Sequence, residues 1–172
     1  MADDAPGRQD AIRVAREDRA RTNALLASID PSAFETTGLG GGTWSPKDLL
    51  GHLETWEENA LAALDAWDRD EQAPIVAELR SLGTDEFNRR AVERKASMSG
   101  AETRTSAAST HARMLERFAA LSDARWTSPP VAGDEATVGM RLGSTLGGDL
   151  GPFRHDPDHW ADLEAFAAEH PA

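Results

Sequence analysis

The chain contains no cysteine and no tyrosine among its 172 residues. The missing cysteine excludes disulfide bonds, thiolate metal ligands and a cysteine nucleophile, so any thiol chemistry would use a thiol from outside the chain. Positive charge is also scarce: 18 lysines and arginines against 30 aspartates and glutamates give a formal net charge of −12. An acidic surface repels phosphate backbones and anionic lipids, so we expect neither nucleic acid nor a membrane surface as a partner.

Long apolar runs are missing as well. No stretch approaches the roughly 20 apolar residues that span a bilayer. The N-terminal sequence MADDAPGRQD is acidic and lacks the apolar core of a signal peptide. We therefore expect a cytoplasmic protein. The length suits a single domain over residues 1–172, with residues 1–7 expected to be disordered.

Strand signals are weak, because no stretch alternates β-branched or aromatic residues with polar ones. Helical periodicity appears instead, with shorter helical stretches after Pro74 and four long amphipathic segments at about residues 8–29, 45–67, 102–121 and 137–166. This pattern predicts an all-α fold, a four-helix bundle with one or two additional short helices.

The clearest helix start is TWSPKDLLGHL, where Ser45 can cap, Pro46 suits the first helical position and Asp48 is the acidic residue three positions after the cap. Three sets of apolar residues are expected to face inward. They are Leu49, Leu53, Trp56, Ala60, Leu64 and Trp67 in the second segment, Ala108, Ala112, Leu115, Phe118 and Leu121 in the third, and Val138, Leu142, Leu146, Leu150, Phe153, Leu163 and Phe166 in the last.

Histidines are the side chains best suited to chemistry. His52 lies on the apolar face of its helix, either as a hydrogen-bonded core residue or as a ligand. His111 lies on a similar face, and the structural role is favoured there because it lacks a partner at helical spacing. His170 is expected to be solvated. His155 and His159 stand four apart, which places two imidazoles on one helix face, and a third histidine from a facing helix would complete a metal site.

Two prolines complicate the histidine pair. The last helix either begins before Pro152 and kinks, keeping both imidazoles on one face, or restarts at Asp156 and leaves His155 in the preceding loop. A plain alternative to a metal site is an exposed helix start with Asp156 as its cap and Pro157 at its first position. His52 and His159 are therefore the firmer ligand predictions.

Three stretches resemble the DinB/YfiT-like metalloenzyme superfamily, and the resemblance spans about residues 8–168. TWSPKDLLGHLETWEENAL is similar to its second-helix signature, FNRRAVERK with Asn88 to its mid-chain segment, and HDPDHWADLEAF to its C-terminal histidine pair. The resemblance implies a four-helix bundle that binds a divalent metal, zinc or nickel among others, through His52, His155 and His159. Members include mycothiol-dependent maleylpyruvate isomerase and bacillithiol S-transferases, and the colibactin self-protection proteins form a related branch.

Two classes of function remain open from the sequence. The first is a metal-dependent S-transferase, isomerase or hydrolase that acts on a small electrophilic molecule, with an external thiol such as mycothiol or with water. The second is a metal-free binding or self-protection protein. We expect Trp44, Trp56, Asn59 and Trp160 to line the substrate pocket, although Trp56 also fits a core position. Asp149 and Asp156 either orient a ligand imidazole or are solvated. The catalytic residues and the oligomeric state, a homodimer included, stay open.

Overall fold

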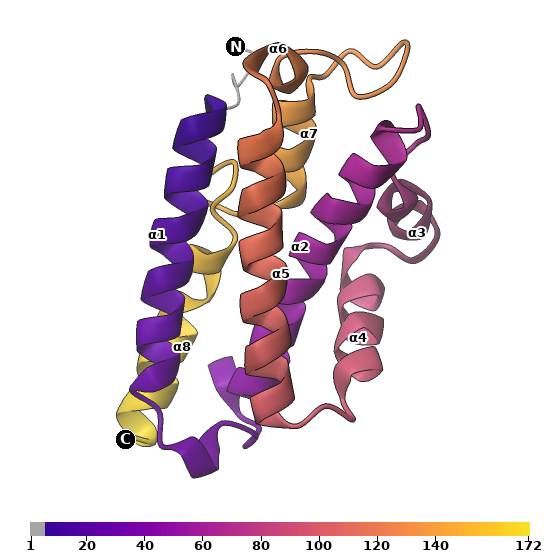
Figure 1. Ribbon diagram of the computed structural model, residues 1–172. Coiled ribbons are helices and arrows are strands. Elements are labelled where there is room, and N and C mark those ends of the chain that lie inside the picture. Colours follow the sequence, from indigo (N-terminus) through magenta and orange to yellow (C-terminus); the bar gives the residue numbers. More distant parts are fainter. Residues whose placement is uncertain (1–5) are drawn as a thin grey trace.

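The computed structural model describes residues 6–172, and these residues form helices and loops without a β-strand (Figure 1). The long helices are α1 (Arg8–Ala27), α2 (Pro46–Trp67) and α5 (Gly100–Ala120). The shorter helices are α3 (Pro74–Leu82), α4 (Thr84–Lys95), α6 (Asp123–Trp126), α7 (Val138–Thr145) and α8 (Trp160–Glu169), and the 3-10 turns are η1 (Pro31–Ala33), η2 (Leu39–Gly41) and η3 (Asp156–His159). The predicted all-α bundle is confirmed.

Local sequence explains where two of the long helices begin. The Ser45 hydroxyl accepts from the Asp48 amide at 3.2 Å, and the Asp48 carboxylate accepts from the Ser45 amide at 2.9 Å. Ser99 and Glu102 form the same reciprocal capping box at the start of α5. Because these contacts satisfy amides that a helix start leaves unpaired, they fix where α2 and α5 begin.

Helix α2 lies at the centre of the molecule. It packs against α5, α4, α3 and α7, while α1 packs against α5 and α8. Helices α7 and α8 share the fourth position of the bundle, one at each end, with an irregular segment between them (Figure 1).

The last helical segment, expected over about residues 137–166 with a bend or break at Pro152 or Pro157, is interrupted earlier, because the chain leaves the helix after Thr145. Gly148 and Gly151 exchange two backbone hydrogen bonds of 3.1 and 2.9 Å, and Gly151 has φ +108°, which L side chains rarely adopt. Leu150 lies at the tip of this turn and is 62% exposed, so its predicted core position is wrong.

The predicted inner face of α5 is shifted by one position. Ala108 and Ala112 are exposed, whereas Thr110 and Met114 are buried. A threonine can occupy a core position here because its hydroxyl donates to the buried Glu54 carboxylate at 3.0 Å. Phe118 is buried as predicted.

The apolar core has two parts, and polar residues separate them along all the packed elements. One apolar cluster includes Ile12, Ala60, Met114 and Phe153, and the other includes Leu26, Leu53, Ala107 and Leu163. Where the two clusters meet lie residues that we call the polar layer: Arg19, Thr22, His52, Glu57, His111, His155, Asp156 and His159. Every histidine of the chain except His170 belongs to it.

The structure describes only part of the N-terminal segment that was expected to be disordered. Residues 1–5 of the segment expected to be disordered lie outside the described residues, whereas the Pro6 carbonyl accepts a 3.2 Å hydrogen bond from the Trp126 indole. Within residues 6–172, none of the helices combines the length and apolar character needed to cross a membrane.

Candidate metal centre

His52 is placed by the well-defined start of α2. The capping box at Ser45 sets the helix register, and His52 then points between α2 and the C-terminal segment with 3% of its surface exposed. The tilted Trp44 ring covers it at a centroid distance of 4.9 Å. A buried imidazole held in this way has little rotational freedom.

His155 and His159 come from the restarted helix. His155 caps η3 with helical dihedral angles (φ −72°, ψ −40°), and Pro157 occupies the first turn, where its missing N–H is tolerated. The His155 amide donates to the Leu146 carbonyl at 3.1 Å, which ties this turn to the end of α7. Of the two alternatives left open by the sequence, the restart is therefore the observed one. His155 nevertheless keeps its four-residue relation to His159, because the backbone is helical from His155 onward.

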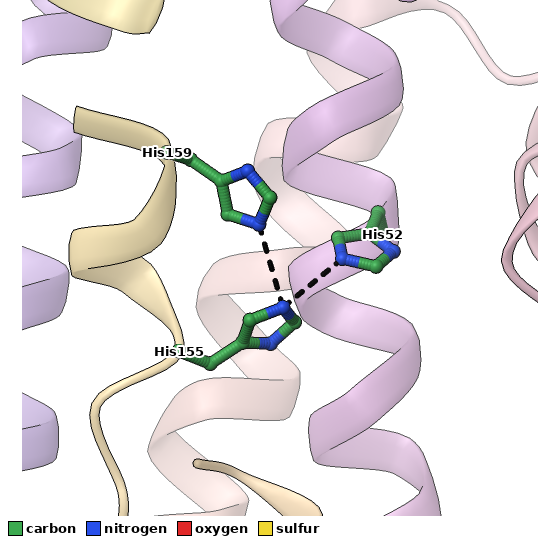
Figure 2. Close-up of side chains that lie close together, drawn as sticks. All are labelled: His52, His155 and His159. Carbon is green, nitrogen blue, oxygen red and sulfur yellow. Dashed lines mark hydrogen bonds between the residues drawn. The ribbon is translucent and has the colours of Figure 1, made fainter. Parts of the chain in front are cut away.

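The three imidazoles converge on one point, as Figure 2 shows. Nε2 of His155 lies 3.1 Å from Nε2 of His52 and 3.4 Å from Nε2 of His159. One ring nitrogen from each residue falls within 4.8 Å of the other two. This arrangement could hold a metal ion through three nitrogen ligands.

One bound cation would satisfy the three ring nitrogens better than hydrogen bonds among the three rings do. An imidazole nitrogen carries either one proton or one lone pair. Nε2 of His155 can therefore complete a hydrogen bond with only one of its two neighbours at a time. A cation accepts a lone pair from all three nitrogens at once, so the donor set matches a divalent metal.

Burial keeps these histidines in the neutral form that a ligand requires. Burial, together with the neighbouring His155 and His159, lowers the pKa of His52 from its ordinary value to about 2. Burial and His159 lower the pKa of His155 to about 4, and burial also lowers that of His159. At neutral pH all three imidazoles offer lone pairs without first losing a proton.

The cluster is accessible on the His159 side. An open cavity of about 280 Å³ is lined by His159, Trp44 and Asp162, with Leu39, Gly42 and Thr43 completing it. The glycine-rich turn η2 packs tightly against α8 beside this cavity: a Cβ added at Gly40 would lie 2.7 Å from the Asp162 carboxylate. A small molecule in this cavity would contact His159 and Trp44.

The four residues predicted to line the pocket lie in different surroundings. Trp44 lines the open cavity. Trp56 meets the His155 ring edge-on at 5.9 Å, and its buried indole N–H has no partner among the described residues. The Asn59 amide donates to the Thr55 carbonyl on its own helix at 2.8 Å. The Trp160 indole donates to Thr22 at 3.0 Å, so this ring packs against α1.

The sequence alone did not identify the charged part of the polar layer. Arg19 on α1 pairs with Asp156 (Nε to Oδ2, 2.8 Å) and with Glu57 (Nη2 to Oε1, 3.2 Å), and Glu57 also contacts His111 (Oε1 to Nδ1, 2.5 Å). Arg154 pairs with Asp18 beside them. The sequence did contain a signal that Arg19 is buried. Arg19 and Thr22 continue the helical spacing of Ile12 and Leu26 on the buried face. Asp149 is exposed, so of the two aspartates that the sequence offered to orient a ligand imidazole only Asp156 lies in the polar layer.

Opposing effects act on the Arg19–Asp156 pair. Burial alone would raise the pKa of the Asp156 carboxyl, but the facing Arg19 outweighs it and the pKa is lowered. Burial likewise disfavours the charged guanidinium, while Asp156 and Glu57 raise the pKa of Arg19 above its ordinary value. Both groups are therefore charged at neutral pH.

Comparison with known proteins gives one result. The sequence model of the DinB superfamily matches residues 15–147, which includes His52 and ends before His155. Neither the curated proteins nor the solved structures gave a match. Because the matched segment covers well over half of the described chain and the structure is a helical bundle, the chain belongs to the DinB superfamily.

Proposed function

We propose that this protein is a divalent-metal-dependent enzyme that acts on a small electrophilic molecule. The observation that carries the proposal is the convergence of Nε2 of His52, His155 and His159 from two separate segments of the chain. Nitrogen ligands of this kind suit zinc, nickel and related ions. Such an ion, when bound, supplies a Lewis acid that favours the deprotonated form of a thiol or of water.

The chain's own residues give the site its shape. Trp44 packs against His52 and Trp56 packs against His155, so these two rings shield the imidazoles on two sides. The open cavity beside His159 is the route by which we expect the substrate to approach, with the Trp44 ring as an apolar surface for it. The reaction is either transfer of an external thiol, such as mycothiol, or hydrolysis, and the absence of cysteine requires the thiol to come from outside.

Elemental analysis tests the metal requirement. Protein purified without a metal-affinity tag should contain about one divalent ion per chain, and His52→Ala should lose it while keeping the helical circular dichroism signal. A wild-type chain that purifies without metal, and whose thermal stability does not respond to added zinc or nickel, would contradict the proposal.

A metal-free binding or self-protection protein is the second candidate. The observation that favours it is the open cavity beside Trp44, which could hold a small apolar molecule without an ion. In that case His52→Ala would leave ligand binding intact. Loss of both the metal and the activity in this variant would favour the enzyme.

A further inference from the structure

A second, smaller cavity, which we call the inner cavity, lies against His155 and is lined mostly by buried residues. Its lining includes His155, Arg19, Glu57, His111 and Asp156, and its volume of about 20 Å³ suits one water molecule. Such a water would find several polar partners within the lining. Figure 2 shows Nδ1 of His155 pointing away from His52 and His159. Because Nε2 of His155 faces the other histidines, Nδ1 is the nitrogen left to hydrogen-bond to this second set of residues.

The charged residues in this lining do not balance. Arg19 carries one positive charge, whereas Glu57 and Asp156 carry one negative charge each. The neighbouring Asp18–Arg154 pair cancels itself. Counted as formal charges, in which histidine contributes none, the sum of +1 and −2 is one net negative charge. The Arg19 and Glu57 side chains are each only 5% exposed, so water screens this charge poorly.

A ligand imidazole works best when its other nitrogen donates to an acceptor. That second hydrogen bond fixes the orientation of the ring and raises the basicity of the metal-binding nitrogen, and its loss typically costs about 10–100-fold in metal affinity. His155 is the one cluster histidine that lines the inner cavity. Its acceptor therefore has to come from the same lining, directly or through one water.

Glu57 is the acceptor that the surroundings select. Asp156 is already engaged by Arg19 through two hydrogen bonds, of 2.8 and 3.2 Å. Glu57 Oε1 contacts His111 at 2.5 Å and Arg19 at 3.2 Å, whereas Glu57 Oε2 has a single contact with Arg19 at 3.5 Å and is the less engaged oxygen. Its oxygens therefore retain free acceptor capacity toward the cavity.

We propose that Glu57 is a positioning residue for the metal centre: through one water in the inner cavity it orients His155, and its buried charge strengthens the binding of a divalent cation. This inference rests on the proposed function only in requiring that the three histidines bind the cation. It assigns Glu57 no contact with substrate.

Helix α2 offers a matched control in Glu54. Both glutamates are buried on the same helix, but Glu54 pairs with Lys95, Ser106 and Thr110 and does not line the cavity beside His155. Replacing either carboxylate by an amide preserves its volume and breaks a buried ion pair. Only the Glu57 change alters the surroundings of His155.

The test is the affinity of Glu57→Gln, Glu54→Gln and the wild type for Zn²⁺ and Ni²⁺, measured by competition with a chromogenic chelator. We expect Glu57→Gln to bind about 10–100-fold more weakly than the wild type. We expect Glu54→Gln to stay within about 2-fold of the wild type, even where its thermal stability falls. Equal affinities of the wild type and Glu57→Gln would overturn the inference while leaving the proposed function standing. A wild type that binds neither ion would overturn both.

A measurement on the wild type covers the case in which Glu57→Gln does not fold. In ¹⁵N-histidine-labelled, zinc-loaded protein, the Nδ1–H proton of His155 should be observed and should exchange slowly with bulk water. Exchange as fast as that of His170, which lies outside the cluster, would show that no buried acceptor holds the proton and would overturn the inference.

Discussion

Nε2 of His52 and Nε2 of His155 lie 3.1 Å apart although the two residues are 103 positions apart in the chain. The close approach depends on two independent pieces of local structure: the capping box that starts α2 and the turn that lets the last helix restart at η3. A metal bound at this point would link the two segments.

Removal of His159 should abolish tight metal binding. It supplies one of three ligands, and we expect His159→Ala to lose more than the roughly 100-fold that changes around a ligand typically cost. The chelator competition described for Glu57 measures this loss. His170→Ala is the control, because His170 packs on Phe166 outside the cluster and should leave the affinity unchanged. Similar affinities of the two variants would exclude His159 as a ligand.

Arg19 should be far more important for stability than its neighbour Arg21. Arg19→Met leaves the buried Glu57 and Asp156 carboxylates without their cation, which should cost about 3–5 kcal/mol in the free energy of unfolding. Arg21→Met breaks an exposed pair with Glu164 and should cost no more than about 1 kcal/mol. Urea unfolding of both variants measures the difference, and similar losses would contradict the buried network.

The metal-free protein should become less stable as the pH falls from about 6.5 toward 4.5. In the unfolded chain histidine takes up protons near its ordinary pKa, whereas burial lowers the pKa of His52 to about 2 and that of His155 to about 4. The unfolded state therefore binds more protons in this window, and stability rises with pH there. Each histidine contributes at most about 1.4 kcal/mol per pH unit.

Urea unfolding in the presence of a chelator, repeated at several pH values in this window, checks the slope. His155→Asn should show a shallower dependence than the wild type, because one of the perturbed groups is gone. A stability that is flat or rises toward pH 4.5 would show that the histidines are not held neutral.

Metal binding should be visible in tryptophan fluorescence. Trp44 and Trp56 lie next to His52 and His155, with ring distances of 4.9 and 5.9 Å, so a paramagnetic ion such as Ni²⁺ should quench them. Trp126 lies in α6 near the end of the bundle where α1 begins (Figure 1). Trp44→Phe should therefore lose part of the quenching and Trp126→Phe should retain it. The reverse pattern would place the ion elsewhere.

Sequence patterns predicted the elements whose ends carry local signals. The capping sequence around Ser45 and Pro46 placed α2 correctly, because these side chains satisfy the helix start without help from the rest of the fold. The break after Thr145 was missed, because Leu146, Leu150 and Phe153 keep a helical spacing through a stretch that tertiary contacts fold back. Glycines at 147, 148 and 151 were the contrary signal.

The candidate site was predicted in part. Three histidines were identified because a histidine on an apolar stripe stands out. Arg19 and Glu57 were not, because a charged residue on an amphipathic helix usually faces solvent. Only the packed structure shows that Arg19 and Glu57 are buried and paired with each other. His155 seemed the weakest ligand in the sequence, yet the structure places it between the other two histidines.

A crystal structure of the zinc-loaded protein tests the central claim most directly. Anomalous scattering at the zinc edge should show one strong peak within about 2.0–2.1 Å of Nε2 of His52, His155 and His159. A zinc ion bound at other residues, or no ordered zinc in protein crystallised with excess ion, would contradict the account.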